Sequence, residues 1–243
     1  MKRYGLIGKT LKHSFSKDYF TKKFAAEGLT GYAYENFELT DIAHIQNLLS
    51  NYPDIKGLNV TIPYKEAVLP YLHMQNDIVE NIHACNCINI VDGKLYGYNT
   101  DVIGFKQSLL QHLQPHHTHA LILGTGGAAK AVQYVLTGLH IDYKTVSRQT
   151  KENVITYDAI NQQMLEEYTL IINTSPVGMY PHMDEAPLLS YEYITPQHFL
   201  FDLIYNPPVT LFLQKGKDKG ATICNGQDML ILQAEESWRI WNE

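Results

Sequence analysis

The sequence contains few of the features that mark secreted or membrane-spanning proteins. It has three cysteines in 243 residues, Cys85, Cys87 and Cys224, and this odd number without a disulfide framework favours a reducing compartment. No apolar run approaches the roughly 18 residues that a membrane helix needs, and the apolar stretch near the N-terminus is too short for a secretory signal. We therefore expect a cytoplasmic protein without a membrane partner.

Positive charge is also scarce. The chain has 19 Lys and Arg against 25 Asp and Glu, a formal net charge of −6, which disfavours binding to nucleic acids. Of the 11 histidines, His116, His117 and His119 cluster in a polar segment, but no second ligand group stands at the spacing of a metal site. We expect neither a nucleic-acid partner nor a bound metal.

What the sequence does contain is an alternation of apolar strands and helical patterns. It is 45% hydrophobic, enough for a sizeable core, and its length fits one large domain or two small ones at roughly 150 residues each. The first half predicts strands at 4–7, 32–37 and 57–61 and helices at 16–27 and 39–49. After the polar segment 114–119, strands follow at 120–123, 143–146, 170–172, 199–204 and 221–224, and a last helix starts near Asp228, its expected N-cap. Strands separated by helices predict two α/β domains with mainly parallel sheets.

A glycine turn directly follows the strand at 120–123. It reads Gly124-Thr125-Gly126-Gly127-Ala128-Ala129, the G-x-G-x-x-A form of a dinucleotide fingerprint, and a helical pattern continues from it. Gly124 permits the turn, Gly126 lets the backbone approach a pyrophosphate, and Ala129 allows the helix to pack closely on the strand. The N-terminus of the helix then offers its N–H groups to phosphate oxygens. A purely structural turn is the alternative, but the strand–helix context favours a nucleotide site.

The end of the next strand indicates which nucleotide. An NAD site usually has Asp or Glu about 20 residues after the glycines, where it binds the ribose 2′-hydroxyl. Here that region contains Ser147 and Arg148, and no acid precedes Glu152. Because a carboxylate would repel a 2′-phosphate whereas the Arg148 guanidinium can bind one, these residues favour NADP. A solvated surface arginine remains the alternative.

Polar residues also follow the predicted strands of the first half. Ser14 and Ser16 come after the first strand, where they can bind a carboxylate; alternatively, Ser16 caps the next helix, which local evidence alone favours. Alternation puts Asn59 and Thr61 on the same side of their strand, and Pro63 ends that strand just before Lys65. Lys65 is therefore expected at the carboxyl edge of the sheet, where open α/β sheets bind ligands.

Asn86 and Asp101 add an amide and a carboxylate to this half of the chain. A Lys65–Asp101 pair beside a carbonyl group can support proton transfer during hydride chemistry. A surface ion pair is the simpler interpretation from the residues alone.

Eight segments together carry a resemblance to a known family. In order, they are Ser14-Phe15-Ser16, Asn59-Val60-Thr61-Ile62-Pro63-Tyr64-Lys65, Cys85-Asn86-Cys87-Ile88-Asn89, Asn99-Thr100-Asp101-Val102-Ile103-Gly104-Phe105, Gly124-Thr125-Gly126-Gly127-Ala128-Ala129-Lys130-Ala131, Asn173-Thr174-Ser175-Pro176-Val177-Gly178-Met179, Asp202-Leu203-Ile204-Tyr205-Asn206-Pro207 and Asn225-Gly226-Gln227-Asp228-Met229-Leu230-Ile231-Leu232-Gln233-Ala234. In this order and over nearly the whole chain, the sequence resembles the shikimate dehydrogenases.

The resemblance implies an enzyme that reversibly reduces 3-dehydroshikimate to shikimate with NADPH, on the pathway to aromatic amino acids. It implies a substrate domain at 1–101, joined by the last helix at 228–243, and a Rossmann-type NADP domain at 102–227. The protein is expected to be a monomer or a homodimer. The implied catalytic residues are Lys65 and Asp101. The implied substrate ligands are Ser14, Ser16, Thr61, Asn86, Asp101, Tyr205 and Gln233. The implied cofactor-binding residues are Gly124, Thr125, Gly126, Gly127, Ala128, Ser147, Arg148, Leu203 and Gly226.

One departure from the family pattern bears on the cofactor. Ser147-Arg148-Gln149 stands where Asn-Arg-Thr is common, so the arginine is retained but the flanking amide and threonine are not. Two other functions therefore stay open at this point: a quinate/shikimate dehydrogenase that uses NAD, and a non-catalytic NADP-binding sensor on the same fold.

Overall fold

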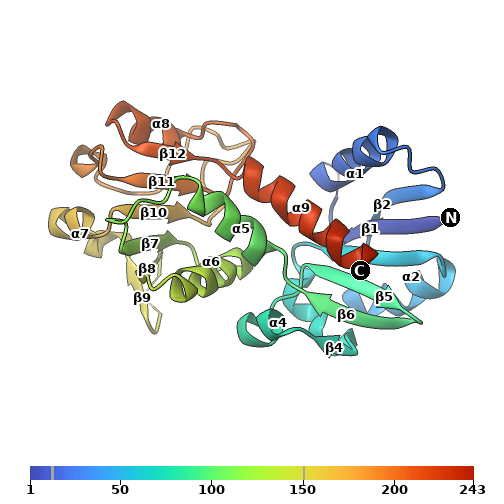
Figure 1. Ribbon diagram of the computed structural model, residues 1–243. Coiled ribbons are helices and arrows are strands. Elements are labelled where there is room, and N and C mark those ends of the chain that lie inside the picture. Colours follow the sequence, from blue (N-terminus) through green and yellow to red (C-terminus); the bar gives the residue numbers. More distant parts are fainter. Residues whose placement is uncertain (12–13, 150) are drawn as a thin grey trace. The chain divides into compact units, whose positions relative to one another are not determined.

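The computed structural model describes residues 1–11, 14–149 and 151–243, which fold into two compact α/β units (Figure 1). The first unit contains Met1–Thr100 and Ala234–Glu243, and the second contains Asp101–Gln233. Each unit has its own six-stranded sheet. The α/β class with two mainly parallel sheets, as expected from the alternating pattern, is confirmed.

The sheet of the first unit has the strand order β2-β1-β3-β5-β6-β4. Its parallel half consists of β1 (Lys2–Gly8), β2 (Tyr32–Glu38) and β3 (Ile55–Val60). The other half is built on a hairpin of β5 (Cys87–Val91) and β6 (Lys94–Tyr98), antiparallel to each other, with β5 also antiparallel to β3; the short β4 (Met74–Gln75) pairs with β6. Asp92 and Gly93 form the turn of this hairpin with positive φ at both residues, the geometry that tight hairpins favour.

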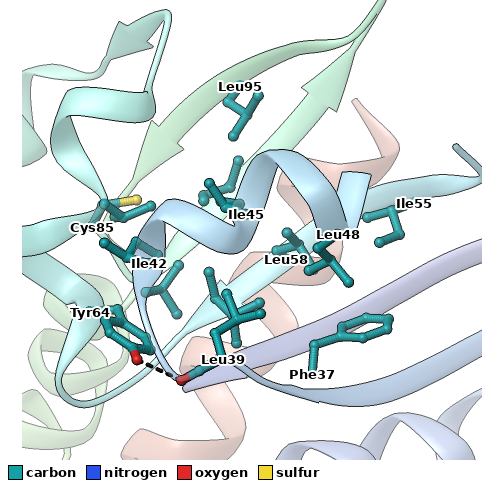
Figure 2. Close-up of a cluster of buried hydrophobic side chains, with 14 of the residues drawn as sticks. Phe37, Leu39, Ile42, Ile45, Leu48, Ile55, Leu58, Tyr64, Cys85 and Leu95 are labelled. Carbon is teal, nitrogen blue, oxygen red and sulfur yellow. Dashed lines mark hydrogen bonds between the residues drawn. The ribbon is translucent and has the colours of Figure 1, made fainter. Parts of the chain in front are cut away.

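Helices cover both faces of this sheet because its strands are apolar on both sides. One face packs against α1 (Phe15–Ala26) and the end of α9 (Gln227–Asn242), where Trp241 donates a hydrogen bond to the Ile88 carbonyl at 3.0 Å. The other face packs against α2 (Ile45–Asn51), α3 (Tyr64–Ala67) and α4 (Asp77–Ile82). Figure 2 shows this second core, with Ile45 and Leu48 of α2 above Leu58 of β3.

The sheet of the second unit is parallel throughout, in the order β12-β11-β10-β7-β8-β9. Its strands are β7 (His119–Leu123), β8 (Asp142–Ser147), β9 (Val154–Thr156), β10 (Leu170–Asn173), β11 (Phe199–Asp202) and β12 (Thr222–Cys224). The strand order reverses at β7, the first strand of this sheet along the chain, which lies between β8 and β10. This arrangement is that of a doubly wound nucleotide-binding fold.

Alternation along the second sheet directs its side chains to two cores. Leu121 and Leu123 of β7 pack with α7 (Gln162–Glu167) and α8 (Leu211–Asp218) on one face. On the opposite face lie α5 (Asp101–Leu110) and α6 (Gly127–Gly138), which contact each other, and Phe105 of α5 meets Phe201 of β11 edge to face. Period-two alternation of buried residues on both faces is what a sheet covered by helices requires.

Several element boundaries differ from the sequence predictions. The helix expected at 39–49 is a 3-10 turn at Ile42–His44 followed by α2, because the Asp41 carboxylate caps the chain at the Ala43 N–H. The last helix begins at Gln227, whose N–H donates to the Asn225 side chain, so Asp228 lies inside the helix and is not its N-cap. The expected strand at 199–204 ends at Asp202.

The two units also divide the chain at different residues from the predicted domains. Asp101 groups with the second unit, because it begins α5. Helix α9 is shared, with Gln233 in the second unit and Ala234 in the first. Its first half belongs to the second unit because it packs directly on α5: a Cβ atom on Gly104 would lie 2.6 Å from the Met229 carbonyl oxygen.

Candidate active site

The carboxyl ends of the second-unit strands bring the predicted cofactor residues to one edge of its sheet. Gly124 follows β7, Ser147 ends β8, Leu203 follows β11 and Gly226 follows β12. Since all these strands run parallel, their last residues lie side by side. Open α/β sheets bind nucleotides at this edge, beside the strand where the order reverses, which here is β7.

The glycine turn between β7 and α6 leaves the start of the helix uncovered. Gly124 has φ +125°, a conformation that favours glycine, and a Cβ atom there would lie 2.6 Å from the Thr174 hydroxyl. Gly126 is the N-cap of α6, with no side-chain cap, and a Cβ atom on Gly126 or Gly127 would meet nothing within 4 Å. The first amides of this 12-residue helix are therefore accessible to an anionic group, which fits the pyrophosphate of a dinucleotide.

Arg148 lies exposed directly after β8. Ser147 pairs in register with Thr156 of β9, so Arg148 and Tyr157 are neighbours at the ends of adjacent strands. Burial raises the pKa of Tyr157, and the positive charge of Arg148 acts in the opposite direction. Arg148 thus places a positive charge at this edge, which suits a 2′-phosphate. An NAD site would instead have a carboxylate here.

Leu203 and Gly226 meet through their backbones. A Cβ atom on Gly226 would lie 2.1 Å from the Leu203 carbonyl oxygen, so only glycine permits this approach. The N–H of Gly226 donates to the Ile204 carbonyl at 3.0 Å, and the N–H of Leu203 donates to the Asn173 carbonyl at 3.0 Å. The structure therefore brings together two residues that the resemblance assigned to the nicotinamide side.

A buried carboxylate beneath these loops was missed by the sequence analysis. Asp202 is fully buried and accepts hydrogen bonds from Asn173 Nδ2 at 3.1 Å, the Ile204 N–H at 3.1 Å and Thr210 Oγ1 at 2.6 Å. Burial raises its pKa to about 6, although the three donors oppose this. The only signal in the sequence was that Asp202 ends an otherwise apolar strand. An acid in that position is more simply interpreted as a solvated loop residue.

The polar residues predicted in the first unit also gather at one edge of its sheet. Ser14 and Ser16 lie at the start of α1, Thr61 follows β3, and Asn86 precedes β5, which runs antiparallel to β3 and so begins where β3 ends. Ser14 is the N-cap of α1, its Oγ accepting from the Lys17 N–H at 3.3 Å, so the predicted cap at Ser16 is wrong by two residues. Thr61 is hydrogen-bonded to β1, because its N–H donates to the Ile7 carbonyl at 2.9 Å.

Lys65 lies half-buried in the short helix α3, which two hydrogen bonds fix. The hydroxyl of Tyr64 donates to the Leu39 carbonyl at 2.6 Å (Figure 2). The carbonyl of Lys65 itself accepts from the Cys85 N–H at 2.8 Å, which ties α3 to the segment that carries Asn86. The lysine backbone is thereby held at the carboxyl edge of the sheet.

The side chain of Asn86 is almost fully buried and bonded to Thr100. Its Oδ1 accepts from the Thr100 N–H at 2.6 Å, and its Nδ2 donates to Thr100 Oγ1 at 3.0 Å. Asp101, the next residue along the chain, is 8% exposed and begins α5. The two bonds therefore fix the peptide that leads into Asp101.

Of the predicted catalytic and substrate-binding residues, three lie in the second unit, namely Asp101, Tyr205 and Gln233. Tyr205 is half-buried, and burial raises the pKa of its phenol. Gln233 is buried, with its Nε2 donating to the Leu230 carbonyl at 2.8 Å. Their joint action with Lys65 on one substrate stays a prediction.

Two remaining features concern metal binding and membrane insertion. Within residues 1–11, 14–149 and 151–243, no three His, Cys, Asp or Glu side chains form a cluster that could hold a metal ion. His116 and His117 both bond to the Gln197 carbonyl. Among the helices of this described part, none combines the length and apolar character that crossing a bilayer requires.

Comparisons with known proteins give the same picture for the whole chain. A family model described as the shikimate dehydrogenase substrate binding domain matches residues 6–88. A protein of Clostridium beijerinckii named shikimate dehydrogenase (NADP(+)) is 40% identical over 254 residues, covering 100% of this chain and 93% of that protein. A protein of the same name from Caldicellulosiruptor saccharolyticus is 36% identical over 258 residues, covering 99% and 92%. The crystal structure of shikimate 5-dehydrogenase from Thermus thermophilus, in complex with NADP(H) and shikimate, matches with a TM-score of 0.87 at 28% identity, covering 99% and 93%.

Proposed function

Because the chain belongs to the shikimate dehydrogenase family, we propose that it catalyses the reversible reduction of 3-dehydroshikimate to shikimate with NADPH. It is then an oxidoreductase acting on a CH–OH group, in the pathway that leads to aromatic amino acids. The proposal assigns substrate binding to the first unit and NADP binding to the second. A cytoplasmic monomer or homodimer that binds only small molecules completes it, and size-exclusion chromatography with light scattering distinguishes the two assemblies.

The second unit provides the groups that NADP needs. The amides at the start of α6, between Gly124 and Ala128, would hold the pyrophosphate, and Ser147 and Arg148 would hold the 2′-phosphate. Leu203 and Gly226 would line the nicotinamide side. When bound, the cofactor supplies the hydride for the carbonyl carbon of the substrate.

The residues of this chain supply the proton and the electrostatic support. Negative charge grows on the carbonyl oxygen as it is reduced, and a protonated Lys65 stabilises that charge and donates a proton to the oxygen. Asp101 orients the lysine and accepts a substrate hydroxyl. In the reverse direction Lys65 accepts the proton from the hydroxyl.

The remaining ligands bind the substrate without adding a second cation. Hydroxyl groups of Ser14, Ser16 and Tyr205 would donate to the carboxylate, so that no other positive charge competes with Lys65. Amide and hydroxyl groups of Thr61, Asn86 and Gln233 would bind the ring hydroxyls. The observation that carries the proposal is the position of α3, which holds Lys65 at the carboxyl end of β3 and bonded to the segment of Asn86.

A direct assay tests the proposal. Purified protein is incubated with shikimate or quinate and with NADP+ or NAD+, and the absorbance of the reduced nicotinamide is followed. We expect turnover with shikimate and NADP+ to exceed the other three combinations. Turnover of quinate with NAD+ as the best pair would instead identify a quinate/shikimate dehydrogenase, and tight NADPH binding without any turnover would identify a sensor.

A further inference from the structure

A continuous chain of buried polar side chains runs beneath the proposed substrate residues of the first unit. Its members are Tyr34 of β2, Asn59 of β3, Ser237 of α9, Thr100 after β6 and Asn86 before β5, which we call the Tyr34–Asn86 network. Each of the five side chains is at most 5% exposed, and they come from five separate elements or loops. Such a set costs free energy to bury unless its hydrogen bonds are complete.

Asn59 at the centre of the network uses its whole side-chain amide. Its Oδ1 accepts from the Tyr34 hydroxyl at 2.8 Å. Its Nδ2 donates both hydrogens, to Ser237 Oγ at 2.9 Å and to the Asn86 carbonyl at 3.3 Å. Because an amide has two donors and this one spends both inside the protein, Asn59 is a structural partner of Asn86 rather than a substrate donor.

The other end of the network fixes the orientation of Asn86. Ser237 Oγ lies 3.2 Å from Thr100 Oγ1, which accepts from Asn86 Nδ2 at 3.0 Å. The Thr100 backbone N–H can only donate, and it lies 2.6 Å from Asn86 Oδ1. The oxygen of the Asn86 amide is therefore held at Thr100, and one of the two Nδ2 hydrogens is left over for a further acceptor.

Tyr34 forms the other end of the network. It is 4% exposed, and burial raises the pKa of its phenol well above the ordinary value. Its hydroxyl donates to Asn59 Oδ1 at 2.8 Å, which fixes the oxygen of that amide and directs its two Nδ2 hydrogens toward Ser237 and the Asn86 carbonyl. The network thus extends from Tyr34 to a residue proposed for a ring hydroxyl, Asn86.

We propose that Tyr34, Asn59, Thr100 and Ser237 are positioning residues that hold Asn86 in the orientation that binds shikimate. This inference rests on the proposed function, and it adds residues to which that proposal assigns no ligand role. Removal of one hydroxyl leaves a buried partner without its bond and lets Asn86 rotate away. Binding of the acid substrate then weakens, whereas NADP binding in the second unit does not depend on these groups.

Two variants on different elements test the network. Tyr34→Phe deletes the phenol hydroxyl, and Thr100→Val deletes the Thr100 hydroxyl while keeping its shape; Thr100→Ser restores the hydroxyl. We expect each deletion to raise the KM for shikimate about fivefold to tenfold, the effect of one buried hydrogen bond, with the KM for NADP+ within about twofold of the wild type. Thr100→Ser is expected to recover most of the wild-type KM.

A matched control separates positioning from general stability. Tyr191→Phe removes a phenol hydroxyl that donates to the Pro187 carbonyl at 2.9 Å in the second unit. It is expected to lower the melting temperature as Tyr34→Phe does, without a change in the KM for shikimate. If either network variant fails to fold, the other decides the question.

The outcomes distinguish the two levels of the proposal. Wild-type protein without shikimate turnover refutes the proposed function. Wild-type turnover with unchanged KM for shikimate in both deletion variants refutes the positioning role. Equal increases in the KM for shikimate and for NADP+ also refute it, because they indicate a general loss of structure.

Discussion

The buried carboxylate of Asp202 should leave a distinct mark on how stability depends on pH. The perturbation is Asp202→Asn, which removes the ionisable group but keeps the shape of the side chain. The new amide oxygen can still accept from Asn173 Nδ2 and the Ile204 N–H, and the amide nitrogen can donate to Thr210 Oγ1. The hydrogen-bonded geometry is therefore expected to survive while the buried charge disappears.

The size and sign of the effect follow from the pKa of this group. Its ordinary value is 3.8, and burial raises the pKa of Asp202 to about 6 in the folded protein. Between these two values the folded state keeps the proton and the unfolded chain does not, so the free energy of unfolding falls as the pH rises. The difference of about two pH units corresponds to a loss of about 3 kcal/mol, complete above about pH 6.

Urea unfolding at several pH values between about 4 and 8 measures this loss. Both tryptophans, Trp238 and Trp241, lie in the first unit, so their fluorescence follows that unit while circular dichroism follows both. We expect the second unit of the wild type to lose stability between about pH 4 and pH 6 relative to Asp202→Asn. Asp158→Asn, at an exposed carboxylate of the same unit, is the control and should keep the wild-type profile. Identical pH profiles for the wild type and Asp202→Asn would refute the reasoning.

Three further predictions concern the proposed cofactor and catalytic residues. Gly226→Ala puts a Cβ atom 2.1 Å from the Leu203 carbonyl oxygen, so we expect a loss of about 1–3 kcal/mol in urea unfolding and a raised KM for NADP+; Gly138→Ala, where a Cβ atom meets nothing within 4 Å, should be neutral in both measurements. Arg148→Gln should raise the KM for NADP+ at least about tenfold and leave that for NAD+ unchanged in steady-state assays, because only the 2′-phosphate is lost as a partner; equal effects on both nucleotides would contradict its assignment. Lys65→Ala should lower kcat about 10²- to 10⁴-fold with a smaller change in the KM for shikimate, and a large rise in KM at unchanged kcat would argue against its role as proton donor.

Much of the fold was predictable because its signals are local. The strands β1, β3, β7 and β10 are short apolar runs, and each was expected within about two residues of its observed bounds. The turn at Gly124 was also readable, since a positive φ and a bare helix start require glycines in a fixed pattern. The α/β class follows from these elements alone.

The hairpin of β5 and β6 was missed although Asp92-Gly93 is a strong turn signal. The first half of the chain otherwise alternates strands and helices, and that pattern predicts parallel pairing throughout. The hairpin reverses β5 against β3, and this reversal carries Asn86 to the edge where β3 ends. A rule that holds for most of a sheet thus failed at the strand that positions a site residue.

The sequence by itself determined the α/β class, the glycine turn and the cationic end of β8, because each depends on neighbouring residues and their spacing. The tertiary structure alone decided that Asp202 is buried, that Gly226 touches Leu203, and that Asn59 donates hydrogen bonds to Ser237 and to the Asn86 carbonyl. These contacts join residues up to 178 positions apart, as between Asn59 and Ser237. No periodicity or local propensity encodes such contacts, since they arise only when separate strands and helices pack and their buried polar groups must find partners.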